Sequence, residues 1–349
     1  MCGGFMIKNT KQKLESPEYE KISVTPRFCY FKPKNEITST IAKEISLSLT
    51  QKRKFIHPKF FYDTIGSNLF EKICSLPEYY ITRTEIELLS SIKSELPNYL
   101  ADEYALVELG SGSSIKTKKL IDVLTTKQSE LEYYPIDISN ILKDSSINLH
   151  DKYENLIITG IIDQYETGLE LIRKLDHKAK LVAFLGSSLG NFDPENATEF
   201  LKKICSSMKK GDLFLLGLDL VKDPTIIESA YNDSSGVTAK FNLNLLSRIN
   251  RELGANFVHD KFEHVAIFNK KQKRIEMYLR SKTKQQVTFS EIDLMLKLKR
   301  GELIHTEYSY KYSIPQIKKI AQKTGFKLAQ IWTDKDNYFS LVLFTVDEI

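Results

Sequence analysis

The stretch "VELGSGSSIKTKKL", from Val107 to Leu120, runs from an apolar segment through a glycine-rich corner into a lysine-bearing helical segment. Gly110 and Gly112 permit backbone conformations, and a close ligand approach, that a side chain would block. The helix that follows offers free backbone N–H groups at its N-terminus. The corner therefore predicts a binding site for a nucleotide-like ligand.

Two features around this corner separate the classes of nucleotide. A dinucleotide-binding turn has the pattern GxGxxG, but Ile115 stands where its third glycine would be, which argues against a dehydrogenase. Asp137 ends the next apolar run, where its carboxylate could accept hydrogen bonds from both hydroxyls of a ribose. The combination favours an adenosine without a pyrophosphate, as in S-adenosylmethionine (SAM). The alternative is a plain strand-to-helix turn in which Asp137 caps a helix.

Short apolar runs alternate with helical segments from about residue 83 to residue 220. Continuous apolar runs bounded by glycine are typical of buried parallel strands, and helices between them cover both faces of one sheet. The runs lie at residues 104–110, 133–139, 156–161, 181–190 and 212–221. The sequence therefore predicts an α/β fold with a doubly wound sheet.

The pattern differs on both sides of this region. Residues 1 to about 55 are polar and irregular, apart from a helix expected at 36–49, where isoleucines and a leucine recur at helical spacing. Residues 264–283 contain two alternating stretches joined by a lysine-rich turn, which predicts an antiparallel hairpin. A second sheet is therefore expected to interrupt the first.

The C-terminal segment returns to the first pattern. Ser313 is expected to cap a helix ahead of Pro315, and residues 327–334 and 338–346 are expected to pair as strands that close the α/β sheet. We therefore expect two domains, with the second inserted into the first. Their expected bounds are 83–220 with 312–349 for cofactor binding, and 1–82 with 221–311 for substrate binding.

Composition limits the function. The 349 residues are 42% hydrophobic, which is enough for a folded globular protein, and the net charge of +5 is spread over short lysine clusters, which argues against nucleic-acid binding. The four cysteines form no CxxC pair and the six histidines no HExxH motif, so neither a disulfide framework nor a metal site is expected. No signal peptide or membrane span is expected either, which favours a cytoplasmic protein.

Longer motifs carry a resemblance to a known family. They are "KFFYDTIGSNLFEKICSLPEYYITRTE" (59–85), "ELGSGSSIKT" (108–117), "FLGSSLGNF" (184–192), "GLDLVKD" (217–223), "AYNDSSGVTAKFNLNLL" (230–246) and "RIEMYLR" (274–280). From about Lys59 to the C-terminus, the chain closely resembles the SAM-dependent histidine Nα-methyltransferases of ergothioneine biosynthesis. The resemblance implies a class I SAM-methyltransferase fold with an inserted α+β substrate-binding domain, acting on L-histidine. A monomer is expected.

The resemblance also implies the cofactor site. Gly110 would lie in the glycine corner, Lys116 would reach the methionine carboxylate, and Asp137 would bind the ribose. The adenine contact is open, because the family usually has an acidic residue followed by an aromatic one, whereas this chain has Asp163, Gln164 and then a tyrosine. Either Asp163 is displaced by one residue, or Gln164 accepts the hydrogen bond from the adenine amine.

The substrate site is implied in the same way. Its expected residues are Tyr79, Asn191, Tyr231, Glu307 and Ser309. Asparagine and tyrosine can donate hydrogen bonds to a carboxylate, whereas a glutamate with a serine suits an imidazole that both donates and accepts. Tyr62 is expected beside the reacting amine.

Two of these positions favour histidine over a larger substrate. In relatives that act on tryptophan-like substrates, we expect Glu307 and Met277 to be replaced by residues suited to a larger apolar ring. The expected reaction is direct displacement of the SAM methyl group by the neutral α-amine, repeated to give the trimethylated product hercynine. The alternatives are an N-methyltransferase of the same fold acting on tryptophan or a derivative, and a SAM-binding module without turnover.

Overall fold

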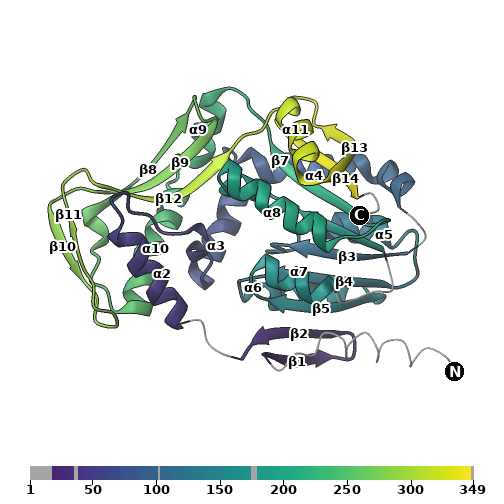
Figure 1. Cartoon of the computed structure of the whole chain (residues 1–349), viewed down its shortest axis with the longest axis horizontal. Coiled ribbons are helices and arrows are strands. Elements are labelled where there is room, and N and C mark those ends of the chain that lie inside the picture. Colours follow the sequence, from purple (N-terminus) through teal and green to yellow (C-terminus); the bar gives the residue numbers. More distant parts are fainter. Residues whose placement is uncertain (1–17, 35–37, 101–102, 174–178, 347–349) are drawn as a thin grey trace.

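A central nine-stranded sheet organises the protein in a computed structural model that describes residues 18–34, 38–100, 103–173 and 179–346 (Figure 1). Its strands are β1 (Tyr19–Thr25), β2 (Phe28–Pro33), β3 (Tyr104–Leu109), β4 (Leu131–Asp137), β5 (Leu156–Ile162), β6 (Ala179–Phe184), β7 (Leu213–Asp219), β13 (Phe326–Thr333) and β14 (Phe339–Val346). They are ordered β1-β2-β5-β4-β3-β6-β7-β14-β13. The strands from β2 to β7 are parallel, whereas β1, β14 and β13 each pair antiparallel with their neighbours.

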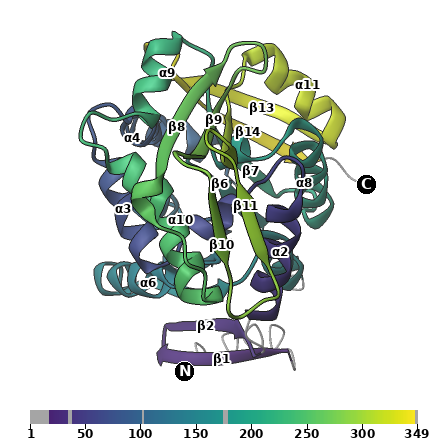
Figure 2. The same cartoon turned by 90° about the vertical axis from the view of Figure 1, so that its left-hand side faces the viewer.

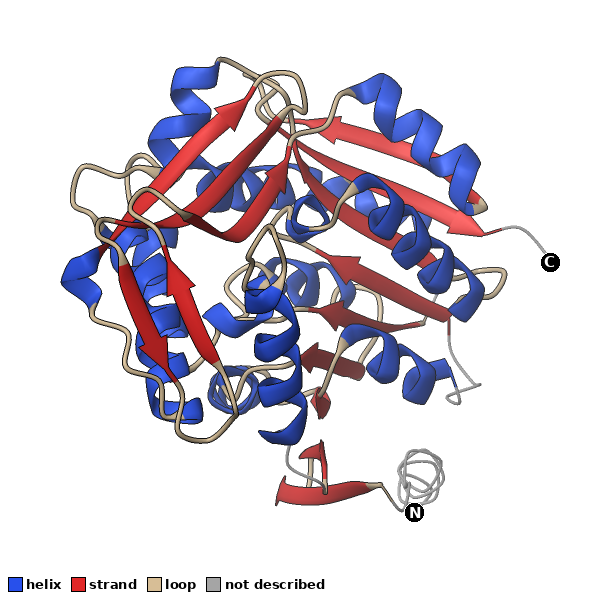
Figure 3. Ribbon diagram, turned by 60° about the vertical axis from the view of Figure 1, so that its left-hand side comes forward, coloured by secondary structure: helices blue, strands red, loops and turns tan. Residues whose placement is uncertain are grey.

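Helices cover both faces of this sheet, as Figure 3 shows. They are α4 (Tyr80–Ser91), α5 (Thr117–Leu124), α6 (Ile141–Lys152), α7 (Tyr165–Arg173), α8 (Pro194–Ser207) and α11 (Ile314–Thr324). Alternate residues of β3 enter separate cores, since Leu106 and Val107 are both wholly buried but belong to different hydrophobic clusters. A strand buried on both faces has no polar side, which explains its continuous apolar sequence. The predicted doubly wound α/β fold is confirmed.

A second group of elements is inserted between β7 and α11. It contains α9 (Pro224–Tyr231), α10 (Val237–Leu253), β8 (Phe262–Asn269), β9 (Arg274–Ser281), β10 (Gln285–Thr288), β11 (Met295–Leu298) and β12 (Leu303–Tyr310), with the short 3-10 helix η5 (His259–Lys261). The strands form an antiparallel sheet ordered β12-β9-β8 and a separate hairpin of β10 and β11 (Figure 2). The predicted hairpin at 264–283 is confirmed by the pairing of β8 with β9.

Elements from the N-terminal part lie against this insertion. They are α2 (Thr38–Thr50), η1 (Pro58–Phe61) and α3 (Thr64–Cys74), and they are followed by η2 (Ile92–Ser94) and η3 (Leu96–Tyr99) nearer the central sheet. Phe61 stacks on Phe241 of α10 with ring centroids 4.3 Å apart. Asp63 caps α3 and also accepts a hydrogen bond of 2.8 Å from Asn244 of α10. The N-terminal helices and the inserted strands therefore form one lobe.

The first two strands correct the expectation of an irregular N-terminal segment. Residues 19–33 form an antiparallel hairpin, and β2 extends the central sheet by pairing in parallel with β5. Only the inner strand β2 has an apolar run, because β1 lies at the edge of the sheet and carries charged residues such as Glu20 and Lys21. Of the expected segment 1–82, residues 19–33 therefore lie in the central sheet rather than against the insertion. Residues 1–17, including Cys2, lie outside the described residues.

The chain passes between the two lobes at several points, and the two passages that flank the insertion lie side by side. Leu220 and Tyr312 form a parallel bridge, the Tyr312 N–H donates to the Asp219 carbonyl, and the Val221 N–H donates to the Tyr312 carbonyl, each at 2.9 Å. Directly after the second passage, Ser313 caps α11 in the predicted position, with its N–H donating to Gln316 at 3.0 Å. The passages therefore hold the insertion to the sheet by hydrogen bonds.

Candidate active site

The glycine corner lies at the carboxyl end of β3. Gly110 and Gly112 have φ angles of +74° and +48°, in the left-handed region that favours glycine. A side chain at Gly110 would place its Cβ 2.9 Å from the hydroxyl oxygen of Tyr165. Among the described residues, the Ser111 hydroxyl between the two glycines is buried without a hydrogen-bond partner. The corner thus has a hydroxyl group that can bond to a polar ligand and, at Gly110, a backbone with no room for a side chain.

Asp137 faces this corner from the end of β4. One carboxylate oxygen accepts a hydrogen bond of 3.0 Å from the Gly112 N–H, and the other accepts one of 2.9 Å from the Ser139 N–H. Burial raises the pKa of Asp137, and the two backbone donors oppose this rise. Each oxygen keeps a second acceptor position, so the carboxylate can bind the two hydroxyls of a ribose. These residues fit the adenosyl part of SAM.

Lys116 lies one residue before α5. Its ammonium group is 3.0 Å from a carboxylate oxygen of Glu85, and Glu85 is wholly buried in α4. Both Glu85 oxygens also accept from the Gly186 N–H at 2.9 Å. Burial lowers the pKa of Lys116, but the charge and the hydrogen bond of Glu85, with smaller contributions from Cys74 and Glu108, together raise it above its usual value. The structure therefore brings Lys116 to the carboxyl end of the sheet, with Glu85 as its ion-pair partner.

The two residues predicted for adenine differ in their surroundings. Asp163 accepts a hydrogen bond from the Tyr19 hydroxyl of β1 and one of 2.6 Å from the Gln164 N–H. The Gln164 side chain is exposed. Asp163 is thus already fixed between the N-terminal hairpin and the start of α7, and the adenine contact stays a prediction for either residue.

A row of aromatic side chains connects the N-terminal segment around α3 to the inserted elements. Tyr62 meets Phe70 at 5.7 Å between ring centroids, Phe70 meets Tyr79 at 6.3 Å, and Tyr79 meets Tyr231 at 6.2 Å. Burial and then the charge of Glu307 raise the pKa of the Tyr62 hydroxyl, and Asp137 adds to this rise. Both carboxylates thus favour the protonated hydroxyl of Tyr62, and its place beside the reacting amine stays a prediction.

The buried carboxylate of the substrate site is Glu307 on β12. Glu307 pairs directly with Met277 of β9 across the sheet, and the side chains of both are buried. Burial raises the pKa of Glu307 to about 7, although the charge of Lys311 opposes the rise. Within the described chain, the Glu307 side chain makes no hydrogen bond to protein. A buried carboxylate without a protein partner is suited to a ligand that donates a hydrogen bond.

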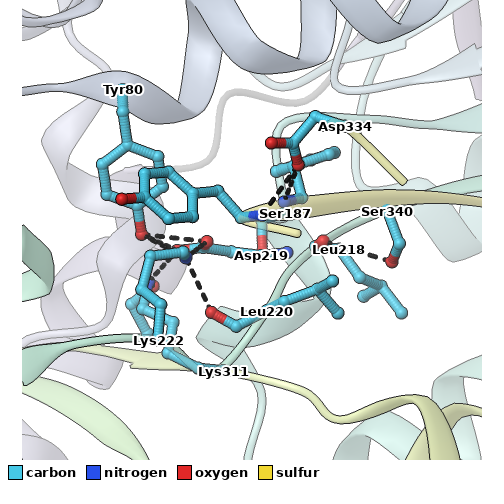
Figure 4. A network of polar contacts seen from close by, with 12 residues as sticks. Tyr80, Ser187, Leu218, Asp219, Leu220, Lys222, Lys311, Asp334 and Ser340 are labelled. Atoms are coloured by element: carbon cyan, nitrogen blue, oxygen red, sulfur yellow. Dashed lines mark hydrogen bonds and ion pairs between the residues drawn. The ribbon is translucent and has the colours of Figure 1, made fainter. Parts of the chain in front are cut away.

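Ser309 and Tyr231 lie beside Glu307 and contact each other. Their hydroxyl oxygens are 2.7 Å apart, and both side chains are buried. Lys311 donates to Ser309 at 2.8 Å and pairs with Asp219 at 2.7 Å. Figure 4 shows Lys311, Lys222 and Tyr80 converging on Asp219. The predicted substrate residues are thus connected to a buried ionic cluster at the lobe junction.

Asn191 reaches the same region from the central sheet. It ends the 3-10 helix η4 (Ser188–Asn191), which follows β6. A side chain at Gly190 would lie 2.8 Å from the Tyr310 carbonyl oxygen, so η4 packs tightly on β12. Asn191 is half-buried next to the strand that holds Glu307 and Ser309. The structure therefore brings the predicted substrate residues together from both lobes.

Sequence reasoning missed several residues of this site. Glu85 and Asp219 lie in quoted motifs and Lys311 lies two residues after Ser309, but no role was assigned to them. A signal existed for Lys311, since positions 307, 309 and 311 alternate along one strand and share a face. No such signal joined Asp219 to Lys311, because their contact depends on the return of the chain to the sheet.

Two other features are absent from the described residues. No helix among them is long and apolar enough to cross a membrane. Within the same ranges, no three His, Cys, Asp or Glu side chains are grouped so that they could hold a metal ion.

A doubly wound sheet with this glycine corner and a carboxylate at the end of the next strand defines a class I SAM-dependent methyltransferase. The family "Histidine-specific methyltransferase, SAM-dependent" matches residues 41–346. The chain therefore belongs to the histidine-specific, SAM-dependent methyltransferase family.

Several relatives support this membership. A histidine N-alpha-methyltransferase from Mycolicibacterium smegmatis is 38% identical over 305 residues, which is 87% of this chain and 94% of the relative. Ergothioneine biosynthesis protein 1 from Neurospora crassa is 27% identical over 85% of this chain and 35% of its own length. A 4-dimethylallyltryptophan N-methyltransferase from Claviceps purpurea is 25% identical over 86% of this chain and 93% of the relative.

Proposed function

We propose that the protein transfers methyl groups from SAM to the α-amine of L-histidine, in the first step of ergothioneine biosynthesis. The observation that carries this proposal is Glu307, a buried carboxylate without a protein partner, beside the Ser309 hydroxyl. An imidazole ring has one nitrogen that donates and one that accepts, so it suits this pair. The family membership and the relatives that methylate histidine support the same substrate.

The proposed cofactor contacts follow from the geometry of the corner. The backbone at Gly110 and the carboxylate of Asp137 would hold the adenosine, and Asp163 or Gln164 would meet the adenine. Lys116 would bind the methionine carboxylate, which places a second anion beside the ammonium group that Glu85 already holds. SAM supplies an electrophilic methyl group bound to a positively charged sulfur.

The proposed substrate contacts orient the amine toward that methyl group. Glu307 and Ser309 would hold the imidazole against Met277, and Asn191 and Tyr79 would hold the amino-acid end. Tyr62 would lie beside the nitrogen, as the resemblance of its motif implies. Tyr231 completes the wall of the pocket through its contact with Ser309.

The reaction needs a neutral amine more than a strong base. The amine lone pair forms the new N–C bond while the S–C bond breaks, and its electrons stay on sulfur. A proton must pass from the nitrogen to solvent before each transfer, and an α-amine with a pKa of about 8 to 9 is partly neutral at slightly alkaline pH, so its neutral form can be selected without a strong base. Holding the nitrogen and the methyl carbon in line lowers the activation free energy by up to roughly 7–11 kcal/mol in favourable systems. We propose three such rounds, which give trimethylated histidine.

Mass spectrometry tests this function directly. Purified protein and SAM are incubated together with histidine, tryptophan or 4-dimethylallyltryptophan, each in a separate reaction. We expect mass increases of one, two and three methyl groups on histidine only, in step with the appearance of S-adenosylhomocysteine. Methylation of a tryptophan substrate in preference to histidine would reject the proposed substrate, and SAM binding without any transfer would reject the enzyme.

We further propose a monomeric, cytoplasmic protein with a SAM-binding domain of residues 83–220 and 312–346, joined by the β1–β2 hairpin. The substrate-binding domain would comprise the inserted residues 221–311 and the N-terminal helices that pack on them. Among the described cysteines, Cys29, Cys74 and Cys205 are free thiols, which supports a reducing compartment. Light scattering after size-exclusion chromatography tests the expected mass of 40.2 kDa.

A further inference from the structure

Lys311 follows β12 directly and is wholly enclosed at the junction of the two lobes. Its ammonium nitrogen lies 2.7 Å from an Asp219 carboxylate oxygen, 2.8 Å from the Ser309 hydroxyl oxygen and 3.2 Å from the Tyr231 hydroxyl oxygen. An ammonium group has three protons and no acceptor. All three of its protons are therefore directed at protein oxygens, and none is left for a substrate.

The contacts of Lys311 limit how many hydroxyl protons Ser309 and Tyr231 can donate to a ligand. Ser309 and Tyr231 each have one hydroxyl proton, and each oxygen also accepts from Lys311. One of the two protons lies in the hydrogen bond of 2.7 Å between Tyr231 and Ser309. Exactly one hydroxyl proton of this pair therefore remains for a ligand.

We propose that Lys311 is a positioning residue for the substrate: it fixes Tyr231 as a donor to Ser309, so that the Ser309 hydroxyl donates to the unprotonated ring nitrogen. Glu307 then accepts the N–H of the other ring nitrogen. This inference rests on the proposed function, because it assigns the ring to the Glu307 and Ser309 pair. Lys311 thereby selects a ring that carries one donor and one acceptor, although Lys311 itself does not touch it.

The ionic cluster holds Lys311 in place before any substrate arrives. The fully buried Asp219 carboxylate accepts from Lys311, Lys222 and the Tyr80 hydroxyl (Figure 4). The charge of Asp219 raises the pKa of Lys311 to about 12 despite its burial, so Lys311 is a cation at neutral pH. A group fixed in this way loses little freedom when a ligand binds.

The same cluster supplies a matched control. Lys222 also pairs with Asp219, but its other hydrogen bonds go to Tyr80 and the Leu220 carbonyl rather than to Ser309 or Tyr231. Lys311→Met and Lys222→Met each leave one cation with one carboxylate. Neither variant strands Asp219 without a partner, so we expect both to fold.

The test measures histidine binding by calorimetry to the full chain saturated with S-adenosylhomocysteine. We expect Lys311→Met to weaken binding roughly 10- to 100-fold, because it removes charge-assisted hydrogen bonds that orient the donor. We expect Lys222→Met to stay within about threefold of the unaltered protein. In a Ser309→Ala background, Lys311→Met should add less than about threefold, because contacts of one network do not add.

Three results would overturn the inference. They are unchanged binding in Lys311→Met, an equal loss in Lys222→Met, and a full further loss when Lys311→Met is added to Ser309→Ala. Thermal denaturation of each variant separates a folding defect from a binding defect. Methyl transfer by the unaltered protein is measured separately, so the expected binding pattern without turnover would reject the proposed function alone.

Discussion

The ammonium nitrogen of Lys116 lies 3.0 Å from a carboxylate oxygen of Glu85, whose side chain is wholly buried. The pair joins α4 to the start of α5 beneath the glycine corner, and Glu85 also holds the Gly186 N–H on the next loop. One carboxylate thus fixes two of the segments that surround the proposed cofactor site. Its removal should affect both folding and cofactor binding.

We expect Glu85→Gln to lower the free energy of unfolding by about 2–4 kcal/mol, because it leaves Lys116 without its anion. Urea denaturation of the ligand-free protein measures this change. The double variant Glu85→Gln/Lys116→Gln should lose less than the sum of the two single variants, since neither charge is then left alone. Additive losses would show that the ion pair contributes nothing of its own.

Asp137→Asn should weaken binding of S-adenosylhomocysteine by roughly 10- to 100-fold, because an amide offers one acceptor oxygen where the carboxylate offers two. The new amide N–H₂ would also face a backbone N–H of Gly112 or Ser139. Calorimetry measures the affinity, and Asp144→Asn on the exposed face of α6 is the control. Equal affinity in both variants would remove Asp137 from the cofactor site.

Tyr62→Phe should lower kcat for histidine by about 10-fold while changing KM by less than about threefold, because its hydroxyl is proposed to orient the reacting nitrogen rather than to bind the ring. Separate rates for histidine and its mono- and dimethylated forms show which transfer depends on the hydroxyl. Tyr99→Phe at the protein surface is the control. Unchanged rates at every step would exclude a role for the Tyr62 hydroxyl.

Glu307→Gln should have opposite effects on stability and activity. The pKa of Glu307 is raised from 4.5 to about 7 in the folded protein, so ionisation opposes folding as the pH rises through this range. At about 1.4 kcal/mol per pKa unit, the full cost is about 3 kcal/mol above pH 7 and is absent below pH 4.5. Without ligand, the variant should therefore be more stable than the unaltered protein at pH 8 and similar to it near pH 4.5.

Activity should move in the other direction, since the amide cannot replace the carboxylate as the acceptor for the ring. Urea denaturation at the two pH values and steady-state kinetics with histidine measure both effects. Glu263→Gln, in an exposed ion pair with Arg280, is the control for stability. A stability difference that does not depend on pH would show that Glu307 is not the group with the raised pKa.

The sequence predicted those parts of the fold that depend on local patterns. Buried parallel strands need continuous apolar runs, and the cap at Ser313 needs only its neighbours, so both were recognised. The β1–β2 hairpin was missed because its outer strand is polar, and an edge strand needs no apolar run. Pairing with β5, which holds this hairpin in the sheet, depends on residues more than a hundred positions away.

The candidate site also contains residues that the sequence predicted and contacts that it could not predict. Tyr62, Glu307 and Ser309 followed from a resemblance in their motifs, and the structure brings them to one region. The contact of Lys311 with Asp219 could not be predicted, because the two residues approach only after the insertion has folded back to the sheet. The hydrogen bond from Tyr19 to Asp163 could not be predicted for the same reason, because the two residues approach only when the β1–β2 hairpin pairs with the sheet.

The paired passages at Leu220 and Tyr312 also determine how the two lobes can move. A single connecting strand could swivel freely, but two strands tied by hydrogen bonds resist torsion about their common direction and yield more easily to bending. Motion of the insertion relative to the sheet should therefore be mainly a bending about these two passages. The proposed acceptor would then return to the proposed methyl donor in the same orientation after each bending motion, as three proposed transfers would need.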